Sequence, residues 1–231
     1  MKYMDETILG ARLLAVSEFV RDGAVLCDVG TDHAKLPIFL TQKNCIKKAY
    51  ATDINAGPIA CAANNVRELG LGEVVECIRT DGLRGTEGLG ITDVSICGMG
   101  GELIVRILSE CGYIRNQEIN LILQPMSHTE DVRRYLFDFG FDIRDERLVR
   151  ETGKLYTVIN AVYSGASVPY SDVDLVLGKV LPKKDRDELF FEMVDRALYH
   201  LENKMKSTDE AAVAEAKALY GKITASAKST K

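Results

Sequence analysis

The sequence predicts an α/β fold in which a mostly parallel sheet carries helices on both faces and a separate helical segment follows. Strand and helix patterns alternate from about residue 24 to residue 139. Two further strands are joined by a turn too short for a parallel crossover. A short stretch of Ser, Gly and Pro then precedes a helical tail. Right-handed crossovers return each helix to the sheet, so helices are expected on both of its faces.

Hydrophobic spacing sets the individual elements. An amphipathic helix is predicted over residues 5–20, because its apolar residues recur at near-helical spacing. The predicted strands are 24–28, 47–53, 73–79, 93–97, 119–124, 141–149 and 154–163. The predicted helices between them are 34–43, 57–69, 101–111 and 128–139. The turn at Gly153 makes the last two strands an antiparallel hairpin at the edge of a seven-stranded sheet.

The remainder of the chain predicts a second domain. Residues 1–163 form the sheet domain, 164–170 a linker, and 171–231 a helical hairpin of coiled-coil type, with apolar residues three and four apart. Ser207 and Glu210 form a capping-box pattern at the start of its second helix. Three uses of this hairpin stay open: contact with RNA, packing on the first domain, or pairing with a second copy.

Composition limits the possible partners. A chain of 231 residues with 46% hydrophobic content can bury a full core. Its net charge is -5, and basic and acidic residues balance at 11 each in residues 171–231, so an RNA surface would be a local patch. The basic residues that could form one, or simply a solvated face, are Arg133, Arg134, Arg144, Arg147, Arg150, Lys154, Lys183, Lys184 and Arg186.

Neither a membrane segment nor a metal site is predicted. The chain has no apolar run of transmembrane length, and its start lacks the basic and apolar regions of a secretory signal, so we expect a cytoplasmic protein. The six cysteines show no C-x-x-C spacing, which predicts small buried hydrophobes and no zinc site or disulfide framework.

An acid and a glycine follow the first strand, and a second acid ends the next one. Asp28 and Gly30, read with Asp53, have the layout of a βαβ unit that binds a nucleoside, with Asp53 placed to accept both ribose hydroxyls. Gly30 stands alone, whereas a dinucleotide site needs three glycines against the pyrophosphate. Negative charge from Asp28 and Asp32 suits a ligand with an ammonium and a sulfonium group. The predicted cofactor is therefore S-adenosylmethionine.

Further motifs accompany this turn over nearly the whole chain. They are residues 28–33 with Leu36 and Pro37, Gly57 and Pro58 after Asp53, Asp81 to Leu83, Cys97 to Gly101, and Leu123 to Pro125. As a set they resemble the bacterial tRNA adenine(22)-N1-methyltransferases. The resemblance implies a Rossmann-like class I methyltransferase fold and methylation of N1 of adenine 22 in tRNA. The chain departs from the family's usual Gln-Pro-Asn at Met126, which cannot supply the hydrogen bond of an Asn side chain.

Active-site loops in such a fold follow strands one, four and five, here at residues 31–33, 98–101 and 124–127. Ring N1 of adenine has a free lone pair, so alignment with the methyl group matters more than a general base. The predicted catalytic residues are Asp32, His33, Gly98, Met99, Gln124 and Pro125. The predicted cofactor-binding residues are Asp28, Gly30, Asp53, Ile54, Asp81, Gly82, Cys97 and Gly98. For the glycines after strand four, a tight turn opening a helix is the alternative interpretation.

Two other functions stay open on sequence grounds. One is a methyltransferase that acts on a small molecule or a protein. The other is a noncatalytic module that keeps the cofactor pocket and binds RNA or a partner chain, which Met126 leaves possible. tRNA is the expected partner, no membrane is expected, and both a monomer and a homodimer fit the sequence.

Overall fold

The computed structural model describes residues 9–184 and 186–228. It divides into two compact units, one up to Val168 and one from Pro169 onward, which are described separately here.

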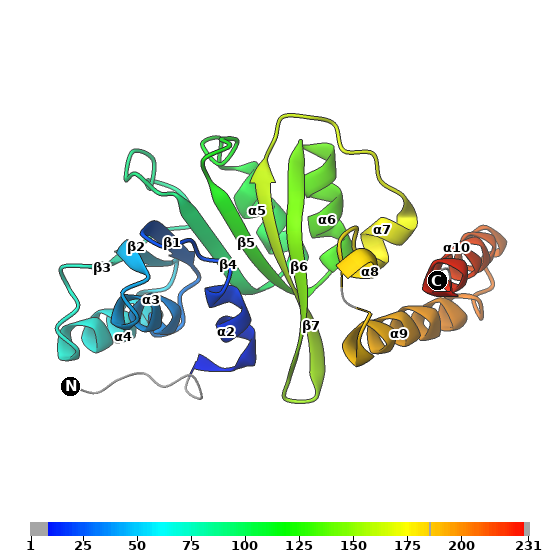
Figure 1. The fold of residues 1–231 in the computed structure, drawn as a ribbon, viewed down its shortest axis with the longest axis horizontal. Helices are drawn as coiled ribbons and strands as arrows, with labels where there is room; N and C mark the ends of the chain where they lie inside the picture. The colour runs from blue at the N-terminus through cyan, green and yellow to red at the C-terminus, as the bar shows by residue number, and fades with distance from the viewer. Residues whose placement is uncertain (1–8, 185, 229–231) are drawn as a thin grey trace. The chain divides into compact units, whose positions relative to one another are not determined.

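The first unit is built on a seven-stranded sheet with the strand order β3-β2-β1-β4-β5-β7-β6 (Figure 1). Strands β1 to β5 are parallel, and β7 runs antiparallel to both β5 and β6. The strands are β1 (Ala24–Val29), β2 (Ile46–Asp53), β3 (Val75–Arg79), β4 (Asp93–Gly100), β5 (Asn120–Ser127), β6 (Phe141–Glu151) and β7 (Lys154–Tyr163). The predicted fold class is confirmed, and within the edge hairpin the outer strand is β6 because β7 pairs with β5.

Helices cover both faces of this sheet. Helices α2, α3 and α4 pack against one face, and α5 and α6 pack against the other. Their bounds are α2 (Ala11–Ser17), α3 (Lys35–Gln42), α4 (Ala56–Glu68), α5 (Gly101–Ser109) and α6 (Thr129–Asp138). The first predicted helix was too long at its carboxyl end, since α2 ends at Ser17; residues 5–8 of that prediction lie outside the described residues.

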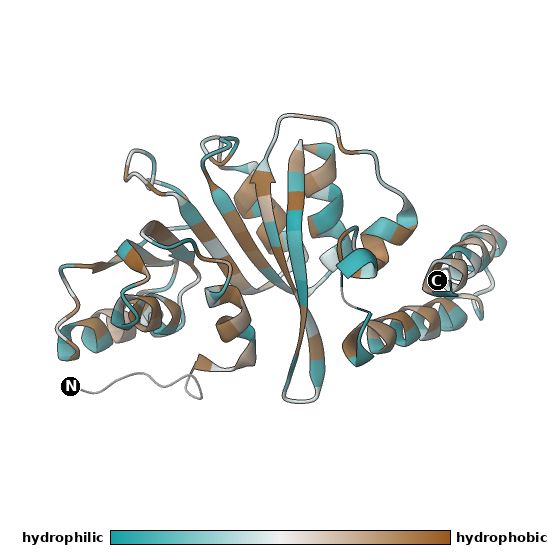
Figure 2. Ribbon diagram, viewed as in Figure 1, coloured by the Kyte–Doolittle hydropathy of each residue, from teal (hydrophilic) through white to brown (hydrophobic). Residues whose placement is uncertain are grey.

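Successive residues of each central strand pack into the cores on opposite faces of the sheet. Leu26 and Ile122 belong to the cluster on the α2–α4 face, whereas Leu121 and Leu123, which are fully buried, belong to the opposite face. Strands β4 and β5 are accordingly hydrophobic over part of their length, with buried polar residues near their ends (Figure 2). Each buried side chain of this kind contributes about 1.5–3 kcal/mol, so the sheet rigidly fixes the ends of its strands.

Two predicted loops are strand ends instead. β4 continues to Gly100 and β5 to Ser127, with register shifts on either side of Met99. The predictions that residues 98–101 and 124–127 form loops after shorter strands were therefore wrong for most of these residues. Glycine and proline disfavour a regular strand ladder, but irregular pairing accommodates them. Bulges of this kind also change the direction of side chains at the edge of a sheet.

The second unit is helical. It comprises α7 (Asp172–Leu177), α8 (Leu181–Lys184), α9 (Glu188–Lys204) and α10 (Glu210–Lys228), and α9 packs against α10 as the predicted hairpin. The predicted capping box at Ser207 was wrong, because the side chain of Asp209 accepts the hydrogen bonds from Ala211 and Ala212 at the start of α10. A capping box is instead present at Ser171 and Asp174.

Several of the basic residues proposed for RNA have partners within the protein. Arg133 is buried and pairs with Glu146, with Nε and Nη2 each 2.8 Å from Oε1, so it is not a surface residue. Arg186 donates to the carbonyl oxygen of Ala227 and lies over the ring of Phe190. Arg147 is half-buried and pairs with Glu18, which gives it a structural role in place of the RNA contact. The exposed basic residues are Arg134, Arg144, Arg150, Lys154, Lys183 and Lys184.

The cysteines are less uniform than the sequence predicts. All six are free, but only Cys27 and Cys111 are buried, and Cys61 is exposed. Within the described ranges, no helix combines the length and the apolar character needed to cross a bilayer.

The pair between Arg133 and Glu146 makes a stability prediction. Replacing Arg133 with Met should lower the free energy of unfolding by about 3–5 kcal/mol, because it leaves a buried carboxylate without its partner. Urea unfolding monitored by circular dichroism measures the change. Arg134→Met is the matched control on the adjacent exposed position and should cost less than about 0.5 kcal/mol. Equal costs for the two variants would contradict this assignment.

Candidate functional site

A buried carboxyl group lies at the carboxyl end of β1. Asp28 is only 6% exposed, and the Ser95 hydroxyl of β4 donates to its Oδ1 at 2.7 Å. Burial raises the pKa of Asp28, and the hydrogen bond from Ser95 opposes that rise. β1 is the strand from which the sheet order runs in opposite directions, toward β2 and toward β4, the position where open α/β sheets bind ligands.

Gly30 holds the turn after β1 in a form that a side chain would not fit. Its φ is +72°, and the amides of Gly30 and Thr31 both donate to the carbonyl oxygen of Thr52, at 2.8 and 2.9 Å. A Cβ at Gly30 would lie 2.1 Å from Cε of Met99. The glycine therefore supplies the left-handed backbone and lets the Met99 side chain lie against the turn.

The turn continues through two left-handed residues without a glycine. His33 and Ala34 have φ values of 58° and 54°, and the Asn65 side chain donates to the carbonyl oxygen of His33 at 3.0 Å. The Asp32 carboxylate is largely exposed; its Oδ2 accepts from Lys35 at 2.6 Å, and its Oδ1 lies 3.4 Å from Nε2 of His33. Asp32 and His33 are thus brought together on the solvent side of the turn.

The end of β2 places Asp53 and Ile54 beside this turn. Oδ1 of Asp53 accepts from the amide of Asn55 at 2.7 Å, which fixes the carboxylate at the end of its strand. The Ile54 side chain is 54% exposed, an unusual state for a large apolar residue on an ordered strand end.

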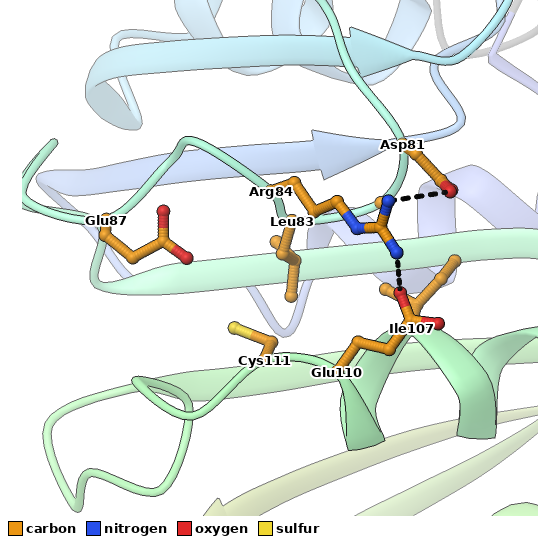
Figure 3. Close-up of a pocket in the computed structure, with 8 residues that line it drawn as sticks. Asp81, Leu83, Arg84, Glu87, Ile107, Glu110 and Cys111 are labelled. Carbon is orange, nitrogen blue, oxygen red and sulfur yellow. Dashed lines mark hydrogen bonds and ion pairs between the residues drawn. The ribbon is translucent and has the colours of Figure 1, made fainter.

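Asp81 lies in an ion-pair network that sequence reasoning missed. Its two oxygens accept from Arg106 at 2.8 and 3.2 Å, and the hydrogen bond from Arg106 lowers the pKa of Asp81. Arg84 lies between Asp81 and Glu110 beside a small cavity (Figure 3). Gly82, with φ +61°, brings backbone against Ile107, where a Cβ would stand 3.0 Å away. The carboxylate is therefore held ionised and oriented by Arg106.

The ends of β4 and β5 meet at the Gln124 carboxamide. Gln124 is fully buried, and its Oε1 accepts from the amide of Gly98 at 3.1 Å and from Nη1 of Arg12 at 2.7 Å. Its Nε2 donates to the carbonyl oxygen of Pro125 at 2.8 Å. The structure thus brings Gly98, Gln124 and Pro125 together, with the Gln124 carboxamide bonded on both sides to protein atoms.

Close backbone packing explains Gly101. A Cβ there would lie 2.2 Å from the carbonyl oxygen of His128 and 2.8 Å from that of Ser127, so only glycine lets α5 begin against the end of β5. Gly98, whose φ is +74°, has no such contact and keeps its left-handed conformation beside Arg12. The alternative interpretation of a tight turn opening a helix thus holds at Gly101.

Arg12 and Met126 complete this corner. The sulfur of Met126 accepts from Nη1 of Arg12 at 3.4 Å, and its side chain is 42% exposed. Cys97 is half-buried next to them; burial, followed by the charge of Asp28, raises the pKa of its thiol well above the ordinary value. Arg12 was missed by sequence reasoning because a single Arg in an amphipathic helix carries no signal of a distant partner.

Among the described residues, one group has the geometry to hold a metal ion. The ligand atoms of Glu102, His128 and Asp131 all lie within 4.8 Å of one another. His128 Nδ1 stands 3.5 Å from a carboxylate oxygen of Asp131 three residues on, which is also the spacing of an ordinary helix-start ion pair. The three side chains are exposed or half-exposed, and the ion pair of His128 and Asp131 accounts for two of them without a metal.

Comparisons with known proteins identify this set of features. A family model described as a methyltransferase domain matches residues 9–159. The tRNA (adenine(22)-N(1))-methyltransferase of Bacillus subtilis strain 168 is 30% identical over 215 residues, which cover 92% of this chain and 90% of that protein.

Solved structures agree with these matches. The crystal structure of the B. subtilis M1A22 tRNA methyltransferase TrmK superposes with a TM-score of 0.85 at 26% identity, covering 95% of this chain and 99% of that one. Streptococcus pneumoniae Sp1610, solved in complex with S-adenosyl-L-methionine, gives a TM-score of 0.82 at 33% identity, covering 92% and 97%. The chain therefore belongs to the tRNA (adenine(22)-N(1))-methyltransferase family.

Proposed function

We propose that this protein transfers a methyl group from S-adenosylmethionine to N1 of adenine 22 in tRNA. The observation that carries the proposal is the similarity to the B. subtilis enzyme, which extends over 92% of this chain and so includes both compact units. tRNA is then its macromolecular substrate, and the cytoplasm is the compartment in which we expect it to act.

The residues at the carboxyl ends of the strands fit this cofactor. Gly30 supplies the left-handed backbone of the turn, and Asp28 and Asp53 supply acceptors suited to an ammonium group and to ribose hydroxyls. Asp81, ionised by its bond to Arg106, keeps further lone pairs for an adenine amino group. The residues proposed to hold the cofactor are Asp28, Gly30, Asp53, Ile54, Asp81, Gly82, Cys97 and Gly98.

Methyl transfer to ring nitrogen needs alignment more than proton removal. The bound cofactor supplies an electrophilic methyl group, and the lone pair of N1 attacks it without a general base. The chain must hold N1 in line with the methyl group and stabilise the positive charge that the ring gains. The residues proposed to do this are Asp32, His33, Gly98, Met99, Gln124 and Pro125.

These residues have different roles in the proposed reaction. The exposed carboxylate of Asp32 is the charged group suited to a cationic ring, with Lys35 and His33 orienting it. Gln124 is already bonded through both ends of its carboxamide, so it shapes the site more than it contacts the base. Met99 supplies an apolar side chain over Gly30.

The helical unit is proposed to extend the tRNA surface. We propose two domains, 1–163 and 171–231, joined by a linker over residues 164–170. Lys183 and Lys184 are exposed on α8, and Arg134, Arg144 and Lys154 are exposed on the first unit. Each phosphate contact adds about 0.7–0.9 to the slope of log affinity against log salt concentration, so these side chains would give tRNA binding a salt dependence.

The function is tested directly by product analysis. Purified protein incubated with S-adenosylmethionine and an unmodified tRNA transcript should form 1-methyladenosine, detected by nucleoside mass spectrometry. A transcript with guanine in place of adenine 22 should accept no methyl group at N1. Methylation that is equal on the two transcripts would contradict adenine 22 as the target, and methyl transfer only to small molecules or proteins would favour the alternative enzyme.

Cofactor affinity should depend on the charge of Asp53. Asp53→Asn keeps an oxygen for the amide of Asn55 but removes a charge-assisted acceptor for the ribose, at a cost of about 1.5–3 kcal/mol. Calorimetry with S-adenosylhomocysteine should therefore show an affinity about 10-fold lower or weaker still. Asp22→Asn, outside the site, should leave the affinity unchanged. Full affinity in Asp53→Asn would remove Asp53 from the cofactor site.

Asp28 should destabilise the cofactor-free protein and support binding of the cofactor. Because its folded pKa is raised above its ordinary value near 3.8, the ionised carboxylate destabilises the fold as pH rises through the folded pKa. Asp28→Asn keeps an acceptor for Ser95, so at pH 7 the cofactor-free variant should gain about 1 kcal/mol, or about 2–4 °C in Tm. This gain should shrink toward pH 4.

Thermal scans with and without S-adenosylmethionine measure both effects of Asp28→Asn. The cofactor should raise the Tm of the variant less than that of the wild type, since the ammonium group loses its carboxylate. A variant that is less stable at pH 7 and equally stabilised by the cofactor would show that Asp28 is only a structural residue.

A further inference from the structure

Arg12 joins three elements at the corner of the proposed site. It lies in the first turn of α2, and its guanidinium contacts Glu151 at the end of β6 and Gln124 on β5. It also lies over the ring of Tyr156 on β7, with Cζ 5.1 Å from the ring centroid. The sequence separations to Glu151 and Gln124 are 139 and 112 residues. These groups therefore meet only when the chain is folded.

Glu151 anchors one side of the guanidinium. Nε of Arg12 donates to Oε2 at 2.5 Å and its backbone amide donates to Oε1 at 3.1 Å. A Cβ at Gly10 would lie 2.7 Å from Oε1, so glycine allows the carboxylate to reach the start of α2. Burial by itself would raise the pKa of Glu151, but the hydrogen bonds from Arg12 lower it below its ordinary value. The arginine is thus fixed at its base, and its side chain is only 23% exposed.

The other side of the guanidinium sets the orientation of Gln124. Nη1 donates to Oε1 of Gln124, the same oxygen that accepts the amide of Gly98. A flipped carboxamide would turn its NH₂ group toward both of these donors and lose its own bond to Pro125. Because a buried donor left unsatisfied costs about 1–3 kcal/mol, the bond from Arg12 selects one orientation. That orientation holds the end of β4 to the end of β5.

We propose that Arg12 is a positioning residue for methyl transfer, acting through Gln124 and Gly98. This inference rests on the proposed function, in which the target base is aligned against the ends of β4 and β5. Misplacement by about 1 Å can cost about 100-fold in rate when alignment supplies the catalysis. Loss of Arg12 should therefore lower kcat, while the cofactor residues on β1 and β2 stay in place.

The chain offers a matched control in Arg147. This residue also ties the segment around α2 to β6, through an ion pair with Glu18 and a position 5.4 Å above the ring of Phe19. Glu18 and Phe19 follow the carboxyl end of α2, whereas Arg12 lies in its first turn. Arg147→Gln thus weakens the anchoring of the segment without removing the bond to the carboxamide.

The test compares Arg12→Gln with Arg147→Gln in full-length protein. We expect Arg12→Gln to lower kcat for tRNA methylation at least 10-fold, a larger factor than any rise in the dissociation constant of S-adenosylhomocysteine. Hydrogen exchange at the Gly98 amide should become about 10-fold faster in that variant. Arg147→Gln should keep kcat and this exchange rate within twofold. Equal losses in both variants, or wild-type exchange at Gly98 in Arg12→Gln, would overturn the proposal.

Two further readouts keep the result decisive. If Arg12→Gln does not fold, Arg12→Lys replaces it, because lysine retains a cation for Glu151. A single ammonium group cannot also bridge to Gln124, so the same losses are expected. Wild-type kcat and exchange in Arg12→Lys would overturn the proposal. If wild-type protein fails to methylate adenine 22, the proposed function falls. The exchange comparison at Gly98 still decides whether Arg12 orients the carboxamide.

Discussion

The proposed site depends on one buried carboxamide. Gln124 is sealed from solvent at the end of β5, and its oxygen takes hydrogen bonds from a charged side chain of α2 and from the backbone of β4. A charge-assisted hydrogen bond inside a protein is about twice as strong as a neutral one, so it orders both partners. The Gln124 carboxamide thus adds a side-chain link at Gly98 to the backbone pairing of β4 and β5.

Glycines allow close packing elsewhere in the proposed site. Gly30 lets the side chain of Met99 lie on the turn after β1, and Gly101 lets α5 begin against the carbonyl oxygens at the end of β5. The edge hairpin contributes to this packing as well. Glu151, at the end of β6, pairs with Lys154 of β7 in the ladder, and its side chain binds Arg12. The antiparallel strands that close this sheet thus also anchor the corner of the proposed site.

Local patterns predicted most of the fold and pointed to the turn after β1. Period-two and period-3.6 hydrophobicity located every strand and sheet-covering helix to within about three residues at most ends, and the Asp28–Gly30 turn with Asp53 needed only residues close in sequence. The strand extensions through Gly98 and Pro125 were missed because glycine and proline argue against a ladder, and irregular register is not visible in a single sequence. These errors fall at the proposed site, where a shifted register positions the chain.

Long-range pairs were beyond sequence reasoning for a different reason. Arg133 was assigned to the surface because arginine is rarely buried, and only the approach of β6 supplies Glu146. Arg106 at Asp81 and Arg12 at Gln124 likewise meet their partners across the fold, with no spacing rule to reveal them. Charged side chains that pair with residues distant in sequence are therefore the part of the proposed site that only a structure can identify.

The most direct measurement is a double-mutant cycle between Arg12 and Gln124 on kcat for tRNA methylation. If the two side chains act as one unit, Arg12→Gln and Gln124→Ala should each lower kcat, and the double variant should be no slower than the slower single variant. Coupling of about 0.5–3 kcal/mol is typical of residues in one hydrogen-bond network. Losses that multiply in the double variant would show that the two residues act independently and would contradict a site organised around the Gln124 carboxamide.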